Sequence, residues 1–155
     1  MVYLVRHAHA GDKRRWPGRD EVRPLSDVGI RQAYGLLDRL AGYPVTRILS
    51  SPTERCRQTV APLAVERGLE VEYAEVLGLD ADDGELLRLV RDPRFEAAVL
   101  CTHGEVIERL FGQLLAGGLR PDGAPRWAKG SVWVLDGAAG VPREGRYLAP
   151  VPLHD

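Results

Sequence analysis

The sequence predicts an α/β domain with three layers, α/β/α, and a largely parallel sheet. Two observations indicate this class. Short apolar runs of β-forming residues alternate along the chain with segments of helical periodicity, the pattern of parallel strands joined by helices. The length of 155 residues is that of one domain able to cover a sheet on both faces, so we expect a single domain over residues 1–155.

The first strand is predicted at residues 2–5, an apolar run that stops at Arg6 and His7. Ser26 is predicted to cap a helix that runs to about Leu40. Ser51 at the N-cap, with Pro52 and Glu54 after it, predicts a second helix start and a capping box. The other predicted elements are strands at 47–50, 71–73 and 97–102, helices at 84–90 and 106–115, and edge strands at 131–136 and 146–150.

The overall charge and the apolar pattern exclude several classes of partner. The formal net charge is −1, which gives no reason to expect nucleic acid or a membrane surface. No apolar run approaches the length of a membrane span, so we expect a cytoplasmic protein. Cys56 and Cys101 lie far apart, which predicts neither a disulfide framework nor a thiolate zinc site.

Four polar side chains follow the carboxyl ends of predicted strands. Arg6 and His7 end the first strand, Arg55 lies just after the second, and His103 follows the fourth. Carboxyl ends of parallel strands meet at one edge of a sheet, where ligands bind in such folds. We therefore expect these residues to form one pocket.

The residue types in this pocket are suited to phosphate chemistry. Guanidinium groups bind phosphate oxygens in bidentate fashion. A neutral imidazole can attack phosphorus and form a phosphohistidine, and cationic neighbours lower the pKa of His7 and so keep it neutral. The second histidine, as a donor, would stabilise charge on the phosphoryl oxygens. This chemistry requires no cofactor and no metal.

Two loops carry cations beside tryptophan. The long segment after the first strand holds Lys13, Arg15 and Trp16, and the Gly- and Pro-rich segment 117–130 holds Trp127 and Lys129. Such loops could bind the base and outer phosphate of a nucleotide, grip an acidic protein surface around a phosphohistidine, or be solvated turns. The predicted ligand is a phosphorylated small molecule or a phosphohistidine protein.

Three motifs resemble the histidine phosphatase superfamily, which has the phosphoglycerate mutase-like fold. Leu4-Val5-Arg6-His7-Ala8 is similar to its Arg-His-Gly signature. Residues 50–59, SSPTERCRQT, resemble its S-S-P-x-x-R-x-x-Q-T segment, and residues 102–104 resemble its second histidine motif. The small size and the tract RHAHAG resemble the SixA-like branch, and also the phosphatase domain that follows a Nudix domain in mycobacterial MutT1-type proteins.

The resemblance implies a role for each motif residue. His7 would be the nucleophile, Arg6 and Arg55 would bind the phosphoryl group, and His103 would complete the pocket. The general acid is left open, because five carboxylates compete for it: Glu75, Asp80, Asp82, Asp83 and Glu105. Glu75 is the one we include among the catalytic residues. A missing acid would favour phosphohistidine, phosphoanhydride or nucleotide diphosphate substrates.

Other classes of function remain open from the sequence. His7, His9 and His103 could form a three-histidine zinc site, although such a site would give Arg6 and Arg55 no function. A non-catalytic phosphate-binding module and a mutase are further alternatives. For His9 and His154 we favour no functional role.

Overall fold

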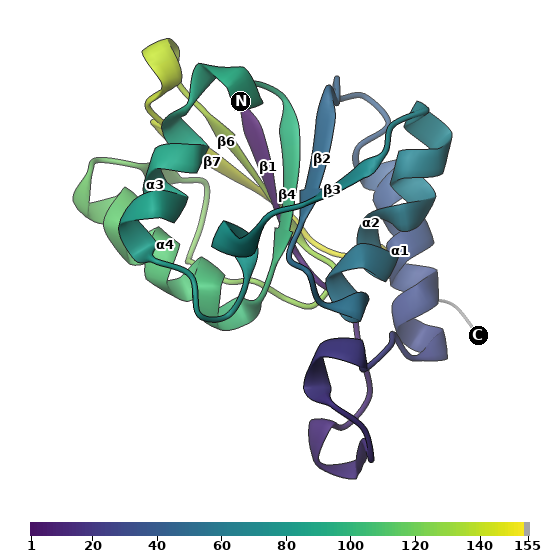
Figure 1. Cartoon of the computed structure of the whole chain (residues 1–155). Coiled ribbons are helices and arrows are strands. Elements are labelled where there is room, and N and C mark those ends of the chain that lie inside the picture. The colour runs from purple at the N-terminus through teal and green to yellow at the C-terminus, as the bar shows by residue number, and fades with distance from the viewer. Residues whose placement is uncertain (154–155) are drawn as a thin grey trace.

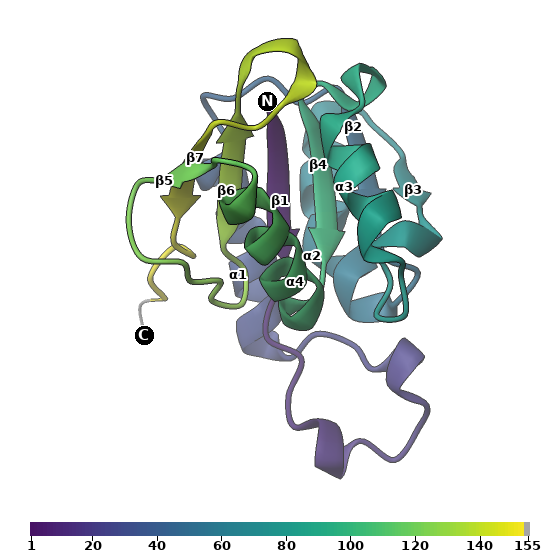
Figure 2. The same ribbon diagram turned by 90° about the vertical axis from the view of Figure 1, so that its left-hand side faces the viewer.

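The computed structural model describes residues 1–153, and they form one seven-stranded sheet between two pairs of helices (Figures 1 and 2). His154 lies outside the described residues. The sheet order is β3-β2-β4-β1-β6-β7-β5. The strands are β1 (Val2–Arg6), β2 (Arg47–Ser50), β3 (Val71–Tyr73), β4 (Ala98–Thr102), β5 (Arg120–Pro121), β6 (Val132–Asp136) and β7 (Glu144–Leu148).

The helices α1 (Asp27–Arg39) and α2 (Glu54–Arg67) cover one face of the sheet, and α3 (Asp83–Arg91) and α4 (Gly104–Ala116) cover the other (Figure 1). Successive side chains of β1 point to opposite faces. Leu4 packs in the core cluster that contains Phe111 of α4, whereas Tyr3 and Val5 pack in the cluster that contains Leu36 of α1. The predicted three-layer α/β class is confirmed.

Parallel pairing joins β1, β2, β3 and β4, while β6 runs antiparallel to β1 and to β7. The prediction that 131–136 is an edge strand is wrong, because β6 lies inside the sheet between β1 and β7. The last strand ends at Leu148, before Pro150, and is also internal. The short β5 pairs with β7 and forms that edge.

The start of α2 also differs from the prediction. The helix begins at Glu54 with Thr53 at the N-cap, and no side chain caps it. The hydroxyl of Ser51 lies 3.0 Å from Nε2 of His103 instead, so it serves the pocket rather than the helix. At α1 the prediction is confirmed, since Ser26 Oγ accepts a hydrogen bond from the backbone of Gly29.

The long segment after β1 leaves the body of the molecule at the carboxyl edge of the sheet (Figure 2). It contains two short 3₁₀ turns, Lys13–Arg15 and Asp20–Val22, before α1 begins. Within the described residues, none of the helices combines the length and the apolar composition needed to cross a membrane.

Candidate active site

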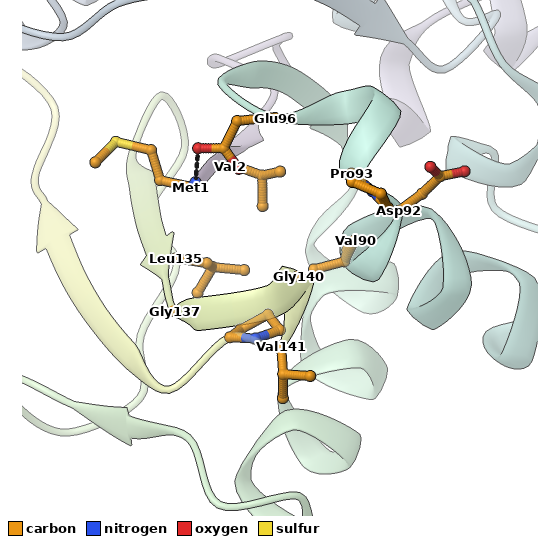
Figure 3. A pocket seen from close by; sticks show the side chains of 11 residues that line it. Met1, Val2, Val90, Asp92, Pro93, Glu96, Leu135, Gly137, Gly140 and Val141 are labelled. Carbon is orange, nitrogen blue, oxygen red and sulfur yellow. Dashed lines mark hydrogen bonds and ion pairs between the residues drawn. The ribbon is translucent and has the colours of Figure 1, made fainter.

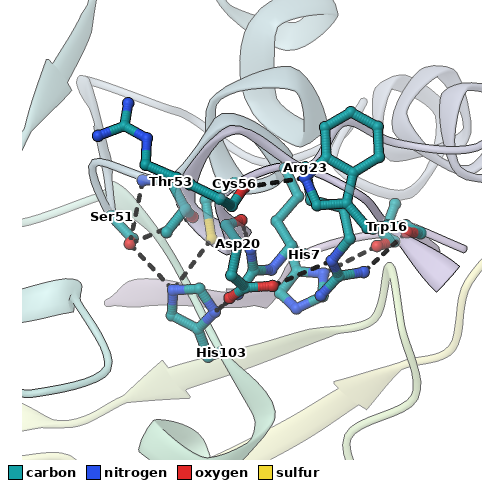
Figure 4. A network of polar contacts seen from close by, with 12 residues as sticks. His7, Trp16, Asp20, Arg23, Ser51, Thr53, Cys56 and His103 are labelled. Carbon is teal, nitrogen blue, oxygen red and sulfur yellow. Dashed lines mark hydrogen bonds and ion pairs between the residues drawn. The ribbon is translucent and has the colours of Figure 1, made fainter. Parts of the chain in front are cut away.

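The carboxyl ends of β1, β2 and β4 bring the three sequence motifs together. Arg6 of β1 is in register with Thr102 of β4, so His7 and His103 leave neighbouring strands at the same level. Their ring centroids are 5.4 Å apart, with the rings at 67°. Figure 4 shows the two imidazoles within one network of polar contacts.

His7 is 7% exposed and is held in one tautomer. Its Nδ1 lies 2.8 Å from the carbonyl oxygen of Ala8. A carbonyl oxygen only accepts hydrogen bonds, so Nδ1 carries the proton and Nε2 keeps its lone pair. Burial lowers the pKa of His7 from 6.5 to about 3; the Ala8 carbonyl opposes this shift, while repulsion from His103, Arg55 and Arg6 adds to it.

Arg6 lies against the first turn of α4. Its Nη1 donates to the carbonyl oxygen of Trp127 at 2.8 Å, and its Nε is buried without a partner among residues 1–153. A Cβ on Gly104 would stand 2.9 Å from both Cζ and Nε of Arg6, so this approach of guanidinium to helix requires glycine. Burial lowers the pKa of Arg6, and the attraction of Glu105 opposes that shift.

Arg55 enters the pocket from the first turn of α2, with 4% of its side chain exposed. Its Nη1 donates to the backbone oxygen of Asp20 at 2.8 Å, and its Nη2 donates to Oδ2 of Asp20 at 3.0 Å. The Arg55 Nε, like that of Arg6, is buried and has no partner in the described part of the chain. Asp20 therefore orients the guanidinium and leaves its Nε–H unpaired within the described residues.

Asp20 links the loop after β1 to the pocket (Figure 4). Its Oδ1 accepts a hydrogen bond from Nε of Arg23 at 3.1 Å, and Nη1 of Arg23 donates to the carbonyl oxygen of Ala10. Although burial acts to raise the pKa of Asp20, hydrogen bonds and attraction from Arg23 and Arg55 lower it overall. The carboxylate is thus ionised and bridges two arginines.

His103 is 1% exposed and contacts both Ser51 and Arg55. Its Nδ1 lies 3.5 Å from Nη2 of Arg55, and a guanidinium only donates. The other ring nitrogen, Nε2, lies 3.0 Å from Ser51 Oγ. Ser51 fixes the orientation of the second histidine.

This arrangement can hold an anion beside a free imidazole lone pair. Buried N–H groups are almost always paired in folded proteins, because an unpaired one costs roughly 1–3 kcal/mol. Two such groups, on Arg6 and Arg55, stand unpaired in the described structure near a neutral His7. A phosphoryl group has oxygens that would satisfy both.

The candidate acids are distributed over several environments. Glu75, Asp80 and Asp82 line a cavity of about 470 Å³ that also reaches Ser51 and Thr53. Asp82 caps α3, and Asp83 is paired with Arg109 at 2.9 Å. Glu105 is exposed at the start of α4. Glu75 is exposed and free of a capping role, so the geometry keeps it as a candidate.

The predicted binding residues divide into two groups. Arg15 and Trp16 line a cavity of about 280 Å³ beside the pocket, and Lys129 lies in the segment that wraps Arg6. Lys13 is exposed on the outer turn of the loop and lines neither of these two cavities.

The structure does not gather the three histidines of the proposed zinc site. His9 Nδ1 lies 2.6 Å from Ser26 Oγ, at the start of α1. Within residues 1–153 we find no group of three or more His, Cys, Asp or Glu side chains placed to hold a metal ion. His9 instead supports the N-terminal end of α1.

A small cavity at the opposite end of β1 is distinct from this site (Figure 3). It has a volume of about 50 Å³ and is lined by Val2, Val90, Leu135 and neighbouring residues. The ammonium group of Met1 pairs there with Glu96. It contains none of the motif residues, so the carboxyl edge is the candidate active site.

Comparison with known proteins agrees with these motifs. Residues 2–78 match the family model described as histidine phosphatase superfamily, branch 1. An 8-oxo-(d)GTP phosphatase of Mycolicibacterium smegmatis is 33% identical over 157 residues, which cover 96% of this chain. The chain belongs to the histidine phosphatase superfamily.

Other superfamily members match less of the chain or are more distant in sequence. A probable phosphoglycerate mutase of Yersinia pestis is 39% identical over 71 residues, 44% of this chain and 33% of its own length. This chain spans 48% of the M. smegmatis relative, so it corresponds to about half of that protein.

Solved structures of SixA share the fold. A protein histidine phosphatase SixA complexed with tungstate superposes with a TM-score of 0.72 at 20% identity, covering 96% of this chain and 94% of its own. A protein assigned as SixA from Nakamurella multipartitia gives a TM-score of 0.72 at 27% identity, covering 97% and 96%. The phosphoglycerate mutase-like fold class is thereby confirmed.

Sequence reasoning missed three parts of this superfamily site. Asp20 and Arg23 were given no role, although their separation of three residues in a long loop is compatible with the ion pair observed. Gly104 was identified only as part of a motif. The reason that glycine is needed there is the close packing of the Arg6 guanidinium against it. These roles arise from contacts between distant segments.

Proposed function

We propose that this chain is a phosphatase that transfers a phosphoryl group to Nε2 of His7 and then to water. It would act as a single domain over residues 1–155 and require no metal or cofactor. The observation that supports this most directly is the free Nε2 lone pair of His7 beside two unpaired, buried guanidinium N–H groups.

The first step is an attack of the His7 Nε2 lone pair on phosphorus. The bond from phosphorus to the leaving-group oxygen or nitrogen breaks, and its electron pair stays with the leaving group. Arg6 and Arg55 neutralise charge on the phosphoryl oxygens, and the ring of His103 closes the other side of the pocket. Water then attacks phosphorus and releases inorganic phosphate, which restores the neutral imidazole.

The need for a proton depends on the leaving group. The leaving group of a phosphoanhydride departs as a stabilised phosphate anion. The alcohol that leaves an alkyl phosphate needs a proton from a general acid. We assign this role to Glu75, which lines the cavity that reaches Ser51. Replacement of Glu75 by Gln should therefore slow hydrolysis of an alkyl phosphate more than that of an anhydride.

Two substrate classes fit this chemistry. One is a nucleoside di- or polyphosphate, the class named for the M. smegmatis relative. The other is a protein phosphohistidine, by analogy with the histidine phosphatase SixA. Both provide a dianionic terminal phosphoryl group for Arg6 and Arg55.

Hydrolysis of p-nitrophenyl phosphate in the presence of a chelator tests the proposed function. We expect activity in the wild type and in His9→Gln, whose side chain lies outside the pocket, and a loss of at least about a thousandfold in His7→Ala. Chelator-sensitive hydrolysis, or equal rates with and without His7, would refute the phosphohistidine mechanism.

A further inference from the structure

A second cavity, of about 280 Å³, lies beside the phosphoryl pocket under the loop after β1. Trp16, Pro24 and Leu25 give it apolar walls. Arg15 and Arg23 supply positive charge, of which Asp12, 3.8 Å from Arg15, offsets a part. Trp16 is held in place, because its Nε1 donates to the carbonyl oxygen of Arg19 at 2.9 Å and its ring packs over Gly18. The cavity therefore offers a fixed aromatic side chain next to a cation.

Arg23 connects this cavity to the phosphoryl pocket. It is 8% exposed, and its Nε binds the same Asp20 carboxylate that Nη2 of Arg55 binds. Asp20 therefore holds the guanidiniums of Arg23 and Arg55 at one carboxylate. A ligand held by Arg55 at its terminal phosphate can place the next phosphate near Arg23.

Lys129 adds a further cation near Arg6 and Arg23. It stands between Trp127, whose carbonyl accepts from Arg6, and Gly130, whose N–H contacts the carbonyl oxygens of Arg6 and His7 at 3.1 and 3.2 Å. Burial lowers the pKa of Lys129, and repulsion from Arg6 and Arg23 lowers it further. An anion placed among these cations would relieve that repulsion.

The cavity of about 470 Å³ that reaches Ser51 and Thr53 has the reverse charge. Its lining includes five carboxylates: Glu21, Glu75, Asp80, Asp82 and Glu85. A second phosphate would be repelled there. A phosphate chain bound at Arg55 is therefore directed toward Arg23 and Lys129.

We propose that Trp16, Arg23 and Lys129 form the leaving-group subsite for a nucleoside diphosphate. The inner phosphate lies between Arg23 and Lys129, and the base stacks on Trp16 in the cavity of about 280 Å³. This inference rests on the proposed function. Attack by His7 Nε2 on the outer phosphorus breaks its bond to the bridging oxygen, the electron pair stays on that oxygen, and a nucleoside monophosphate leaves.

Calorimetric titration tests the subsite without turnover. The probes are the non-hydrolysable α,β-methylene analogue of GDP, methylenediphosphonate and inorganic phosphate. We expect the nucleotide analogue to bind about tenfold more tightly than methylenediphosphonate, because a base stacked on an aromatic ring contributes an affinity gain of that order. Methylenediphosphonate should in turn bind more tightly than phosphate.

Two substitutions distinguish the contribution of the base to binding from that of the inner phosphate. Trp16→Leu should weaken the nucleotide analogue about tenfold and leave methylenediphosphonate unchanged, whereas Trp16→Phe should retain stacking. Lys129→Gln should weaken both diphosphate probes about tenfold while leaving phosphate nearly unchanged. Arg146→Gln removes an equal charge from the exposed part of β7 and serves as the matched control.

The subsite is refuted if the nucleotide analogue binds no more tightly than phosphate, or if Trp16→Leu and Lys129→Gln change affinities no more than Arg146→Gln does. Circular dichroism of each variant distinguishes a lost contact from a loss of folding. If Trp16→Leu does not fold, the affinity of Trp16→Phe for the nucleotide analogue is compared with that of the wild type instead. Failure of His7-dependent hydrolysis would refute the proposed function separately, since binding of these probes needs no turnover.

Discussion

At the scale of single residues, the environment of His7 explains its chemistry better than its sequence motif does. The motif predicted a neutral imidazole because cations surround it, but burial is the largest cause of the lowered pKa. The tautomer follows from one backbone contact, Nδ1 to the Ala8 carbonyl. That contact could not be predicted from residue types, because it depends on the path of the chain after β1.

The pH dependence of stability tests the neutral state of His7. Unfolded His7 takes up a proton as the pH falls below 6.5, whereas folded His7 stays neutral to about pH 3. The unfolded state therefore binds more protons in this window. As the pH is lowered through it, the free energy of unfolding decreases by up to about 1.4 kcal/mol per pH unit. His7→Asn should show a shallower decline in urea titrations between about pH 6.5 and pH 4. Identical slopes would contradict the buried neutral imidazole.

Two glycines of α4 provide a matched test of the Arg6 position. Gly104→Ala places a Cβ against the Arg6 guanidinium, so we expect kcat/KM for p-nitrophenyl phosphate to fall about tenfold or more. A Cβ on Gly112 would meet nothing within 4 Å beyond its own helix backbone, and Gly112→Ala should stabilise the helix by about 1 kcal/mol without changing kcat/KM. If Gly104→Ala and Gly112→Ala have equal kcat/KM values, the function of Arg6 does not depend on its close packing against residue 104.

At the scale of elements, local signals predicted most helices and strands, and they failed where a side chain had a distant partner. Ser26 caps α1 as predicted, since its hydroxyl has the backbone of Gly29 within reach. Ser51 carries a similar local signal, yet its hydroxyl bonds to His103 at the end of β4, and α2 begins later. A capping motif in the sequence cannot show that a distant side chain will take the hydroxyl in place of the helix backbone.

The C-terminal end of α2 tests an element far from the pocket. Gly68 has φ of +66°, a left-handed conformation in which a Cβ costs about 1 kcal/mol. Gly68→Ala should lower the free energy of unfolding by about that amount, measured by urea denaturation, and Gly68→Asn should lower it less. Because Gly68 precedes β3 at the amino edge of the sheet, kcat/KM should not change. A neutral or stabilising Gly68→Ala would contradict the assigned cap.

At the scale of the whole molecule, the alternation of strands and helices was sufficient to predict the layers and the edge at which the motifs meet. It did not predict that β6 would insert beside β1, because the last two strands were both expected at an edge of the sheet. The bridge from Arg23 through Asp20 to Arg55 was also unpredicted, since it joins a loop to a helix across the pocket. Local patterns predicted the scaffold, and tertiary contacts determined how the site is held.

The most direct test of the central proposal is detection of the phosphoryl group on the protein. After rapid acid-free quenching of turnover with p-nitrophenyl phosphate in chelator, intact-protein mass spectrometry should show one added phosphoryl group, and peptide mapping should locate it on His7. The adduct should be stable in alkali, labile in acid, and absent from His7→Ala. Turnover without a protein-bound phosphoryl group, or with one on another residue, would contradict the mechanism.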